Sequence, residues 1–179
     1  MLHIAICDDS PMHQQIIQSE IKKALKLPYK ITLFSSGRKF LEEISGGKCP
    51  YNIVFMDVAL GEGDPSGILV AKKISCANPM AQIIFISQYL EFASDVYETA
   101  HVYFIIKNRL SELLGKALNT ALSKLSEVQK QHLYFRTKQG LQKVDIHKIW
   151  YTEKKLRNTF LFTASETFQP SQKIEELLE

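Results

Sequence analysis

Five polar side chains stand where four apolar segments of the chain end: Asp8 and Asp9 after the first of these segments, then Asp57, Ser87 and Lys107. Three carboxylates in one pocket would repel one another and favour a divalent cation, and an all-oxygen ligand set favours Mg²⁺. The lysine ammonium and the serine hydroxyl can bind the oxygens of a phosphoryl group. The residue types therefore predict a carboxylate that accepts a phosphoryl group, with Mg²⁺ and Lys107 neutralising charge in the transition state.

Each of these residues also has an ordinary structural interpretation. An aspartate or serine after a strand commonly caps the next helix or forms a turn, and a lysine at a strand end is commonly exposed. The combination, in this order along the chain, favours a phosphoacceptor site over coincidence. An aspartate-nucleophile phosphatase is disfavoured, because such enzymes carry a second acid where this chain has Ala59. We therefore predict no enzyme acting on an external substrate, only self-phosphorylation from a phosphodonor and slow self-hydrolysis.

Hydrophobic periodicity predicts the elements that position these side chains. Short apolar runs that are typical of strands buried on both faces occur at 2–7, 51–57, 81–87 and 101–107. Residues 29–34 alternate between apolar and polar types, which is typical of a half-exposed edge strand. The first helix is expected to begin at Ser10-Pro11, a favourable N-cap and first-turn pair. In the helix predicted at 67–77, the residues expected to face inward are Ile68, Leu69, Ala71 and Ile74.

Further helices are predicted around Phe40 and at 91–99 and 110–125, so that five strands alternate with five helices. This pattern predicts an α/β fold with a parallel sheet covered by helices on both faces. A flavodoxin-like, doubly wound sheet in the order 2-1-3-4-5 fits two apolar central strands and one alternating edge strand. In such a sheet the carboxyl ends of the strands meet at one edge, which would bring the five polar side chains together.

Composition is that of a globular protein: 45% of the 179 residues are hydrophobic and 23% are charged. This length allows one large or two small domains. No apolar run approaches the roughly 18 residues that span a bilayer, and the N-terminus does not resemble a signal peptide. We therefore predict a cytoplasmic protein with no membrane partner. Cys7, Cys49 and Cys76 are widely spaced and lack a CxxC pattern, which favours reduced thiols over a metal site.

A β-rich segment follows from about residue 128, with a hairpin at 132–148 and strands at 149–151 and 159–163. A final helix is predicted at 172–179. A segment of ~50 residues is near the lower limit for an independent core. Between residues 130 and 160 there are eight basic and two acidic residues, although the whole chain carries a net charge of only +3. This excess favours a polyanionic partner, and a solvated basic face is the ordinary alternative.

The chain up to residue 125 resembles the receiver domain of two-component response regulators, and we place the domain boundary after residue 127. The segments that carry the resemblance are Ile6-Cys7-Asp8-Asp9-Ser10, Phe55-Met56-Asp57, Gly67, Ile83-Ile84-Phe85-Ile86-Ser87 and Tyr103-Phe104-Ile105-Ile106-Lys107. Two features depart from most receivers: Asn108 follows Lys107 where proline is usual, and the loop after Asp57 is longer.

The resemblance implies a role for each residue of the predicted site. Asp57 would be phosphorylated by a sensor histidine kinase. Asp9, Asp57 and the carbonyl of Ala59 would bind Mg²⁺, and Asp8 would do so chiefly through water. Lys107 would neutralise the phosphoryl group. Ser87 and Phe104 would form a switch pair, in which the hydroxyl turns toward the phosphoryl group and the aromatic ring fills the vacated space.

Residues 128–179 resemble the beginning of a LytTR-type DNA-binding domain, as found in peptide quorum-sensing regulators. The segments that carry this resemblance are Leu133-Tyr134-Phe135-Arg136-Thr137, 144–153 and 167–178. A complete domain of this type is about twice as long. The resemblance implies that DNA is contacted by Lys154, Lys155, Arg157 and Asn158.

Two functional hypotheses follow. The first is a response regulator that forms a phosphorylation-dependent homodimer and controls transcription through the LytTR-type domain. The alternative is a signalling receiver that dimerises or competes for the kinase without binding DNA.

Overall fold

The computed structural model describes residues 1–130, 132–156 and 158–173. The chain divides into two compact units, Met1–Leu125 and Ser126–Glu179, which are described separately. Within the described residues, no helix has both the length and the apolar character needed to cross a membrane. Cys7, Cys49 and Cys76 are not joined in disulfides.

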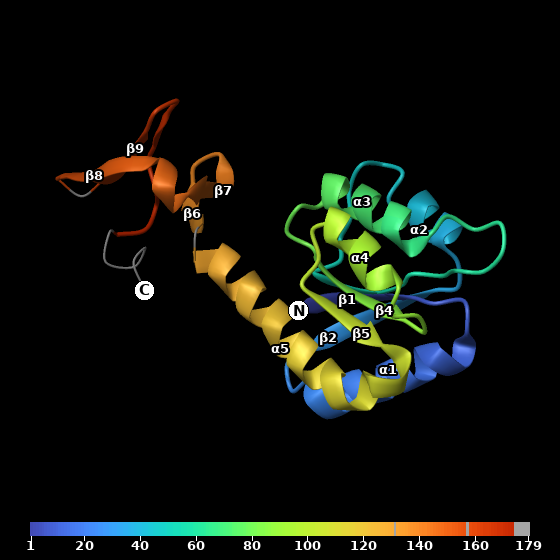
Figure 1. Ribbon diagram of the computed structural model, residues 1–179. Coiled ribbons are helices and arrows are strands. Elements are labelled where there is room, and N and C mark those ends of the chain that lie inside the picture. Colours follow the sequence, from blue (N-terminus) through green and yellow to red (C-terminus); the bar gives the residue numbers. More distant parts are fainter. Residues whose placement is uncertain (131, 157, 174–179) are drawn as a thin grey trace. The chain divides into compact units, whose positions relative to one another are not determined.

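The first unit is built around a five-stranded parallel sheet in the order β2-β1-β3-β4-β5, which confirms the predicted fold class (Figure 1). The strands are β1 (Leu2–Cys7), β2 (Tyr29–Phe34), β3 (Ile53–Asp57), β4 (Gln82–Ser87) and β5 (Tyr103–Ile106). The helical elements are α1 (Pro11–Ala24), α2 (Gly37–Glu43), α3 (Gly67–Ala77), α4 (Phe92–Asp95), η1 (Val96–Glu98), η2 (Lys107–Arg109) and α5 (Leu110–Lys130), the last of which continues past residue 125.

Helices cover both faces of this sheet: α1 and α5 lie on one face, and α2, α3 and α4 on the other (Figure 1). The central strands carry continuous apolar runs, Ile4–Cys7 in β1, Ile53–Met56 in β3 and Ile83–Ile86 in β4, because both faces of the sheet are covered. Along β1, Ile4 and Ile6 belong to the core beneath α1 and α5, whereas Ala5 and Cys7 belong to the opposite core. The edge strand β2 is only partly buried, as its alternating sequence predicts.

Three local predictions about the first unit were inaccurate. The helix predicted at 91–99 is a single α-helical turn, α4, followed by the 3₁₀ turn η1. Lys107 begins the 3₁₀ turn η2 and does not end β5. In α3 the buried residues include Val70, whereas Leu69 is 46% exposed.

The register of the sheet aligns the carboxyl ends of its strands. Cys7 pairs with Met56 of β3, and Asp57 pairs with Ile86 of β4. Ser87 in turn pairs with Ile106, the residue before Lys107. The polar residues at the strand ends are therefore delivered to one edge of the sheet, as expected for parallel strands.

The second unit is rich in β-structure, as predicted. A hairpin of β6 (His132–Thr137) and β7 (Gly140–Asp145) is followed by η3 (Ile146–Lys148) and a three-stranded antiparallel sheet in the order β10-β9-β8. The strands of that sheet are β8 (Ile149–Lys155), β9 (Asn158–Thr163) and β10 (Thr167–Phe168). β8 is longer than predicted, because it pairs with β9 up to Lys155.

The described part of the second unit has a small core, made of Phe135, Val144 and Leu161. Leu133, Ile149 and Phe168 pack against it while staying partly exposed. Of the helix predicted at 172–179, Gln172 and Lys173 are not helical, and the remaining residues lie outside the described range.

Candidate functional site

Three carboxylates meet at the carboxyl edge of the parallel sheet. Asp8, Asp9 and Asp57 each offer one oxygen atom, and these oxygens lie within 4.8 Å of one another. Asp8 and Asp57 are 1% and 3% exposed, whereas Asp9 is exposed. Asp8 Oδ1 accepts a hydrogen bond of 2.9 Å from the backbone N–H of Ser10, and Asp57 Oδ1 accepts one of 3.2 Å from that of Ala59. Local backbone groups therefore orient both buried acids.

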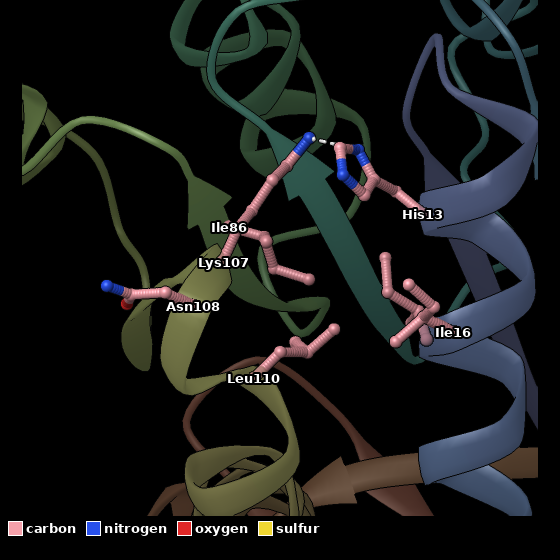
Figure 2. Close-up of a pocket in the computed structure, with 7 residues that line it drawn as sticks. His13, Ile16, Ile86, Lys107, Asn108 and Leu110 are labelled. Carbon is pink, nitrogen blue, oxygen red and sulfur yellow. Dashed lines mark hydrogen bonds between the residues drawn. The ribbon is translucent and has the colours of Figure 1, made fainter.

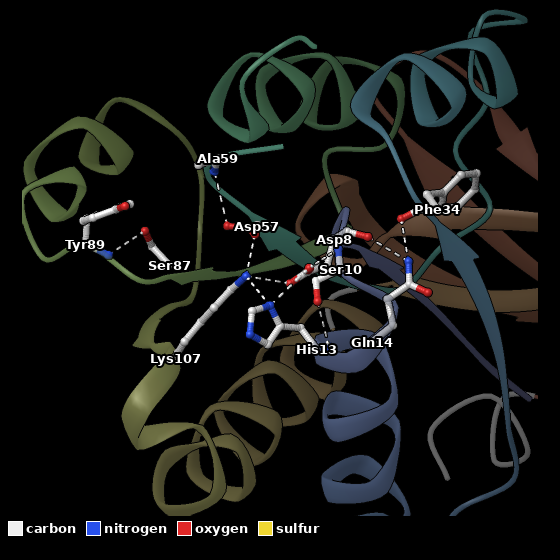
Figure 3. Close-up of polar contacts among 10 residues, drawn as sticks. All are labelled: Asp8, Ser10, His13, Gln14, Phe34, Asp57, Ala59, Ser87, Tyr89 and Lys107. Carbon is white, nitrogen blue, oxygen red and sulfur yellow. Dashed lines mark hydrogen bonds and ion pairs between the residues drawn. The ribbon is translucent and has the colours of Figure 1, made fainter. Parts of the chain in front are cut away.

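The ammonium of Lys107 lies against the two buried acids (Figure 3). Its Nζ donates a hydrogen bond of 2.6 Å to Asp57 Oδ2 and lies 2.9 Å from Asp8 Oδ2. The contact with Asp8 is an ion pair without hydrogen-bond geometry, because Asp8 Oδ2 is buried and accepts no hydrogen bond. Nζ also lies 2.9 Å from Nδ1 of His13.

Burial and charge act in opposite directions on this group of residues. Burial raises the pKa of Asp57 above its usual range and outweighs the hydrogen bond and charge of Lys107, which lower it. Burial alone would lower the pKa of Lys107, but its interactions with the two acids, Asp57 and Asp8, are together stronger, so that this pKa is raised. The lysine is therefore held as a cation, while Asp57 is a carboxylate whose burial is incompletely compensated.

The composition of the pocket fits a hard divalent cation. Three carboxylates face one ammonium, and one buried oxygen of Asp8 accepts no hydrogen bond. Oxygen donors of this kind suit Mg²⁺, which binds through one or two carboxylates and keeps several waters. Asp8, Asp9 and Asp57 are the residues that would hold the ion. Ala59 is exposed and follows Asp57 closely, and a contribution from its carbonyl stays a prediction.

Ser87 and Phe104 lie on the neighbouring strands β4 and β5. Ser87 is fully buried, and its hydroxyl oxygen accepts a hydrogen bond of 3.1 Å from the backbone N–H of Tyr89. Phe104 pairs with Phe85 in the sheet and packs, partly buried, against the core on the α2–α3 face. Both residues are thus on the strands beside Asp57, and their action as a switch pair stays a prediction.

The loop after Asp57 is fixed at both of its ends. Gly67 donates a backbone hydrogen bond of 2.9 Å to the carbonyl of Val58, which closes the base of the loop. Inside the loop, the carboxylate of Asp64 accepts hydrogen bonds from the backbone N–H groups of Gly37 (2.6 Å) and Arg38 (3.2 Å) at the start of α2. The extra length of this loop is therefore ordered against α2.

Sequence reasoning missed two residues of the site, both in the first turn of α1. Gln14 is buried, and its side-chain amide donates hydrogen bonds to the carbonyls of Asp8 (2.8 Å) and Phe34 (3.0 Å). His13 contacts Lys107 and lies 3.5 Å from Asp8 Oδ1. The available signal was the N-cap at Ser10, because a helix that begins directly after β1 must place its first turn beside the strand ends.

The residues predicted to contact DNA belong to the second unit. Lys154 and Lys155 are exposed at the end of β8, and Asn158 is exposed at the start of β9. Lys155 forms an ion pair of 3.1 Å with Glu153. Arg157 lies outside the described residues. Lys155 pairs with Asn158 across the two strands.

Among solved structures, the similar ones share the fold of the first unit. The N-terminal domain of a response regulator/sensory box/GGDEF protein from Carboxydothermus hydrogenoformans is 24% identical, with a TM-score of 0.59, over 72% of this chain and 98% of that one. The response regulator TrrA from Thermotoga maritima, solved in complex with Mg²⁺–BeF, is 24% identical, with a TM-score of 0.55, over 67% of this chain and 99% of that one.

Sequence comparisons agree with this fold. Accessory gene regulator protein A of Staphylococcus epidermidis is 28% identical over an alignment of 138 residues, which covers 73% of this chain and 58% of that protein. The chain thus spans little more than half the length of this curated relative. The family model described as the response regulator receiver domain matches residues 4–119, which is well over half of the chain. This protein therefore belongs to the response regulator receiver domain family.

Proposed function

We propose that Asp57 accepts a phosphoryl group from a sensor histidine kinase and that the protein acts as a phosphorylation-controlled regulator. The contacts of Lys107 with Asp57 and Asp8 are the observation that carries this proposal. An ammonium held against a buried carboxylate is suited to neutralise the charge of a phosphoryl group on that carboxylate. The exposed Asp9 leaves the pocket open to solvent on one side, where a phosphodonor can approach.

Each residue of the pocket has its own proposed role in phosphoryl transfer. Asp8, Asp9 and Asp57, with the Ala59 carbonyl, would hold Mg²⁺, which would supply positive charge for the transferring phosphoryl oxygens. Asp57 is orientated through both carboxylate oxygens, by the N–H of Ala59 and by Lys107. The phosphoryl group adds roughly −1.5 to −2 units of charge, which Lys107 is placed to balance. Turnover of an external substrate is not part of this proposal.

The charge added at Asp57 is proposed to reach the surface through Ser87 and Phe104. The Ser87 hydroxyl would turn to donate its proton to a phosphoryl oxygen. This turn would break the hydrogen bond that Ser87 Oγ accepts from the N–H of Tyr89, and so would free the loop that follows β4. Phe104 is only partly buried, so its ring has room to move inward. A core with two discrete packings is the kind of element that a local charge can bias.

Labelling with a small phosphodonor tests the acceptor. The full chain is incubated with acetyl phosphate and Mg²⁺, and intact mass spectrometry reports the gain of one phosphoryl group. We expect labelling of the wild type, none of Asp57→Asn, and none of the wild type when a chelator removes Mg²⁺. Labelling of Asp57→Asn would place the acceptor at another residue.

The regulatory output is proposed to be transcription, through DNA binding by the second unit. This rests on the resemblance to LytTR-type domains, on the basic composition of residues 130–160 and on the name of the relative, an accessory gene regulator. The exposed Lys155 and Asn158 support it, since cationic side chains contact phosphates and amides can reach base edges. Lys154 and Arg157 complete the proposed set. Phosphorylation is proposed to act by promoting a homodimer.

A mobility shift with a mixed-sequence DNA duplex tests this output at several salt concentrations. Phosphate contacts make binding weaken steeply with salt. Lys154→Ala and Lys155→Ala should each reduce that slope by about one unit, whereas Lys72→Ala on α3 serves as the matched control and should not. Equal binding by all three variants would argue against the assigned loop.

One observation favours the alternative, a receiver that signals without DNA. The described part of the second unit buries only three apolar side chains fully enough to form a core, and Trp150 and Tyr151 of β8 are 70% and 54% exposed. A unit with so small a core is marginal for holding a recognition surface. If this alternative holds, the protein binds the duplex neither with nor without acetyl phosphate. Light scattering in the presence of acetyl phosphate would still detect dimerisation of the first unit.

A further inference from the structure

The ammonium of Lys107 has three hydrogen-bonding protons and three close partners. Two partners are the buried acids, Asp57 Oδ2 at 2.6 Å and Asp8 Oδ2 at 2.9 Å. The third is Nδ1 of His13 at 2.9 Å. An ammonium only donates, so Nδ1 must be the accepting nitrogen, and the ring proton of the neutral imidazole is then on Nε2.

His13 is held in place by the first turn of α1. Ser10 caps this helix by accepting a hydrogen bond of 3.4 Å from the backbone N–H of His13. The adjacent Gln14 ties the same turn to the ends of β1 and β2 through its two amide hydrogen bonds. The turn that carries His13 is therefore held by three hydrogen bonds, none of which involves Lys107.

His13 differs from the other two partners of Lys107 in its expected behaviour during phosphoryl transfer. Asp8 and Asp57 carry charge, and both are assigned to the cation or to the phosphoryl group. His13 carries no charge in the accepting state and has no assigned role in binding the ion. It is the partner that can keep its contact with the ammonium while the acids change theirs.

We propose that His13 is a positioning residue for Lys107: its Nδ1 anchors the ammonium beside Asp57 before and during phosphoryl transfer. This inference rests on the proposed function. A lysine side chain loses rotamer entropy when it is fixed in one position. An anchor that survives the rearrangement of the acids keeps the amine where the new charge develops.

The surroundings of His13 allow this to be tested without disturbing the core. His13 and Lys107 line a cavity of about 260 Å³ that also borders Ile16, Ile86, Asn108 and Leu110 (Figure 2). The His13 side chain is 23% exposed. A smaller residue at this position opens space that is already partly open, so that repacking of the sheet is not required.

Two variants of similar size separate an acceptor from a mere space filler. Asn places its side-chain oxygen near the position of Nδ1, whereas Leu has the same branching without an acceptor. Initial rates of labelling by acetyl phosphate with Mg²⁺ are measured on the full chain. We expect His13→Asn to stay within about twofold of the wild type and His13→Leu to be slower by about tenfold, as for one hydrogen bond to a charged group. Equal rates for the Leu variant and the wild type, or equal slowing of both variants, would overturn the proposal.

A second measurement needs no phosphodonor and so separates this inference from the proposed function. The ¹H–¹⁵N signal of the Lys107 ammonium is visible only while its protons exchange slowly, and Lys107→Met assigns it. We expect this signal in the wild type and in His13→Asn, and its loss in His13→Leu. An unchanged signal in His13→Leu, or no signal in the wild type, refutes the anchor. A wild type that shows the expected signals but is never labelled instead refutes the phosphoacceptor function.

Discussion

Gly67 is the residue at which one added methyl group should have the largest effect on the site. A Cβ atom built on Gly67 would lie 1.9 Å from the backbone oxygen of Asp57 and 2.9 Å from its carbonyl carbon. The obstacle is backbone, so either the start of α3 or the end of β3 must move by about 1 Å or more, which is overpacking that typically costs about 1–3 kcal/mol. The movement also strains the hydrogen bond from Gly67 to Val58, worth about 1 kcal/mol. We expect Gly67→Ala to lose about 2–4 kcal/mol of unfolding free energy.

Urea unfolding followed by far-ultraviolet circular dichroism measures this loss on the full chain. Gly115→Ala is the matched control, because a Cβ there meets only Ala24 Cβ at 4.0 Å and lies inside α5. That variant should gain about 0.5–1 kcal/mol from helix propensity. Labelling at Asp57 should fall in the first variant and not in the second. A Gly67→Ala protein as stable as the control would refute the close packing of α3 against the Asp57 carbonyl.

Three further perturbations address the groups around the acids. Gln14→Leu removes one donor from each of two carbonyls, those of Asp8 and Phe34, although the Phe34 carbonyl still accepts the backbone N–H of Asp8. This variant should cost about 1–3 kcal/mol in urea unfolding, whereas Gln15→Leu at an exposed position should change stability by less than about 0.5 kcal/mol. Lys107→Ala leaves two buried acids unpaired and should cost about 3–5 kcal/mol, which added Mg²⁺ should partly restore in the same assay; no effect of Mg²⁺ would contradict the assigned ligands. Asp9→Ala should weaken Mg²⁺ binding in calorimetry without altering stability in the metal-free protein, and unchanged binding would remove that residue from the ligand set.

The parallel sheet was predictable because its strands are apolar on both faces and end at polar residues. Continuous apolar sequence indicated the central strands, and alternating sequence indicated the edge strand at 29–34, so the order of the strands could be predicted. Parallel pairing in that order then aligns the ends of the strands. The rotation of α3 was not predictable, because residues 68–71 are all apolar and periodicity cannot choose among them. The close contact of Gly67 with Asp57 sets that rotation, and Val70 is buried in place of Leu69.

The short helix α4 shows where periodicity alone misleads. Its N-cap, Glu91, makes no side-chain capping hydrogen bond, and none of its residues is buried. A helix without a cap or a buried face gains little over other conformations. The chain therefore makes one turn and continues as the 3₁₀ turn η1, in which Val96 is the buried residue.

The acids, the hydroxyl and the lysine were predictable as residue types at strand ends, but their partners were not. His13 and Gln14 reach the site because of the angle at which α1 leaves β1, and that angle depends on tertiary packing. The spacing of residues in the sequence does not predict this angle. A helix capped directly after a functional strand is therefore a place to look for partners of a strand-end site.

The energetics of the pocket explain why these partners matter. Burying two carboxylates and an ammonium is a poor way to stabilise a fold, since desolvation offsets most of the attraction between them. The raised pKa of Asp57 has the same origin, because burial outweighs the nearby lysine. A carboxylate in that condition is stabilised by any added positive charge, and the proposed phosphorylation would change its surroundings further. The Gln14 amide and the His13 ring add no further charge to the pocket, and they are therefore the groups that we propose keep the acids and the lysine in place through that change.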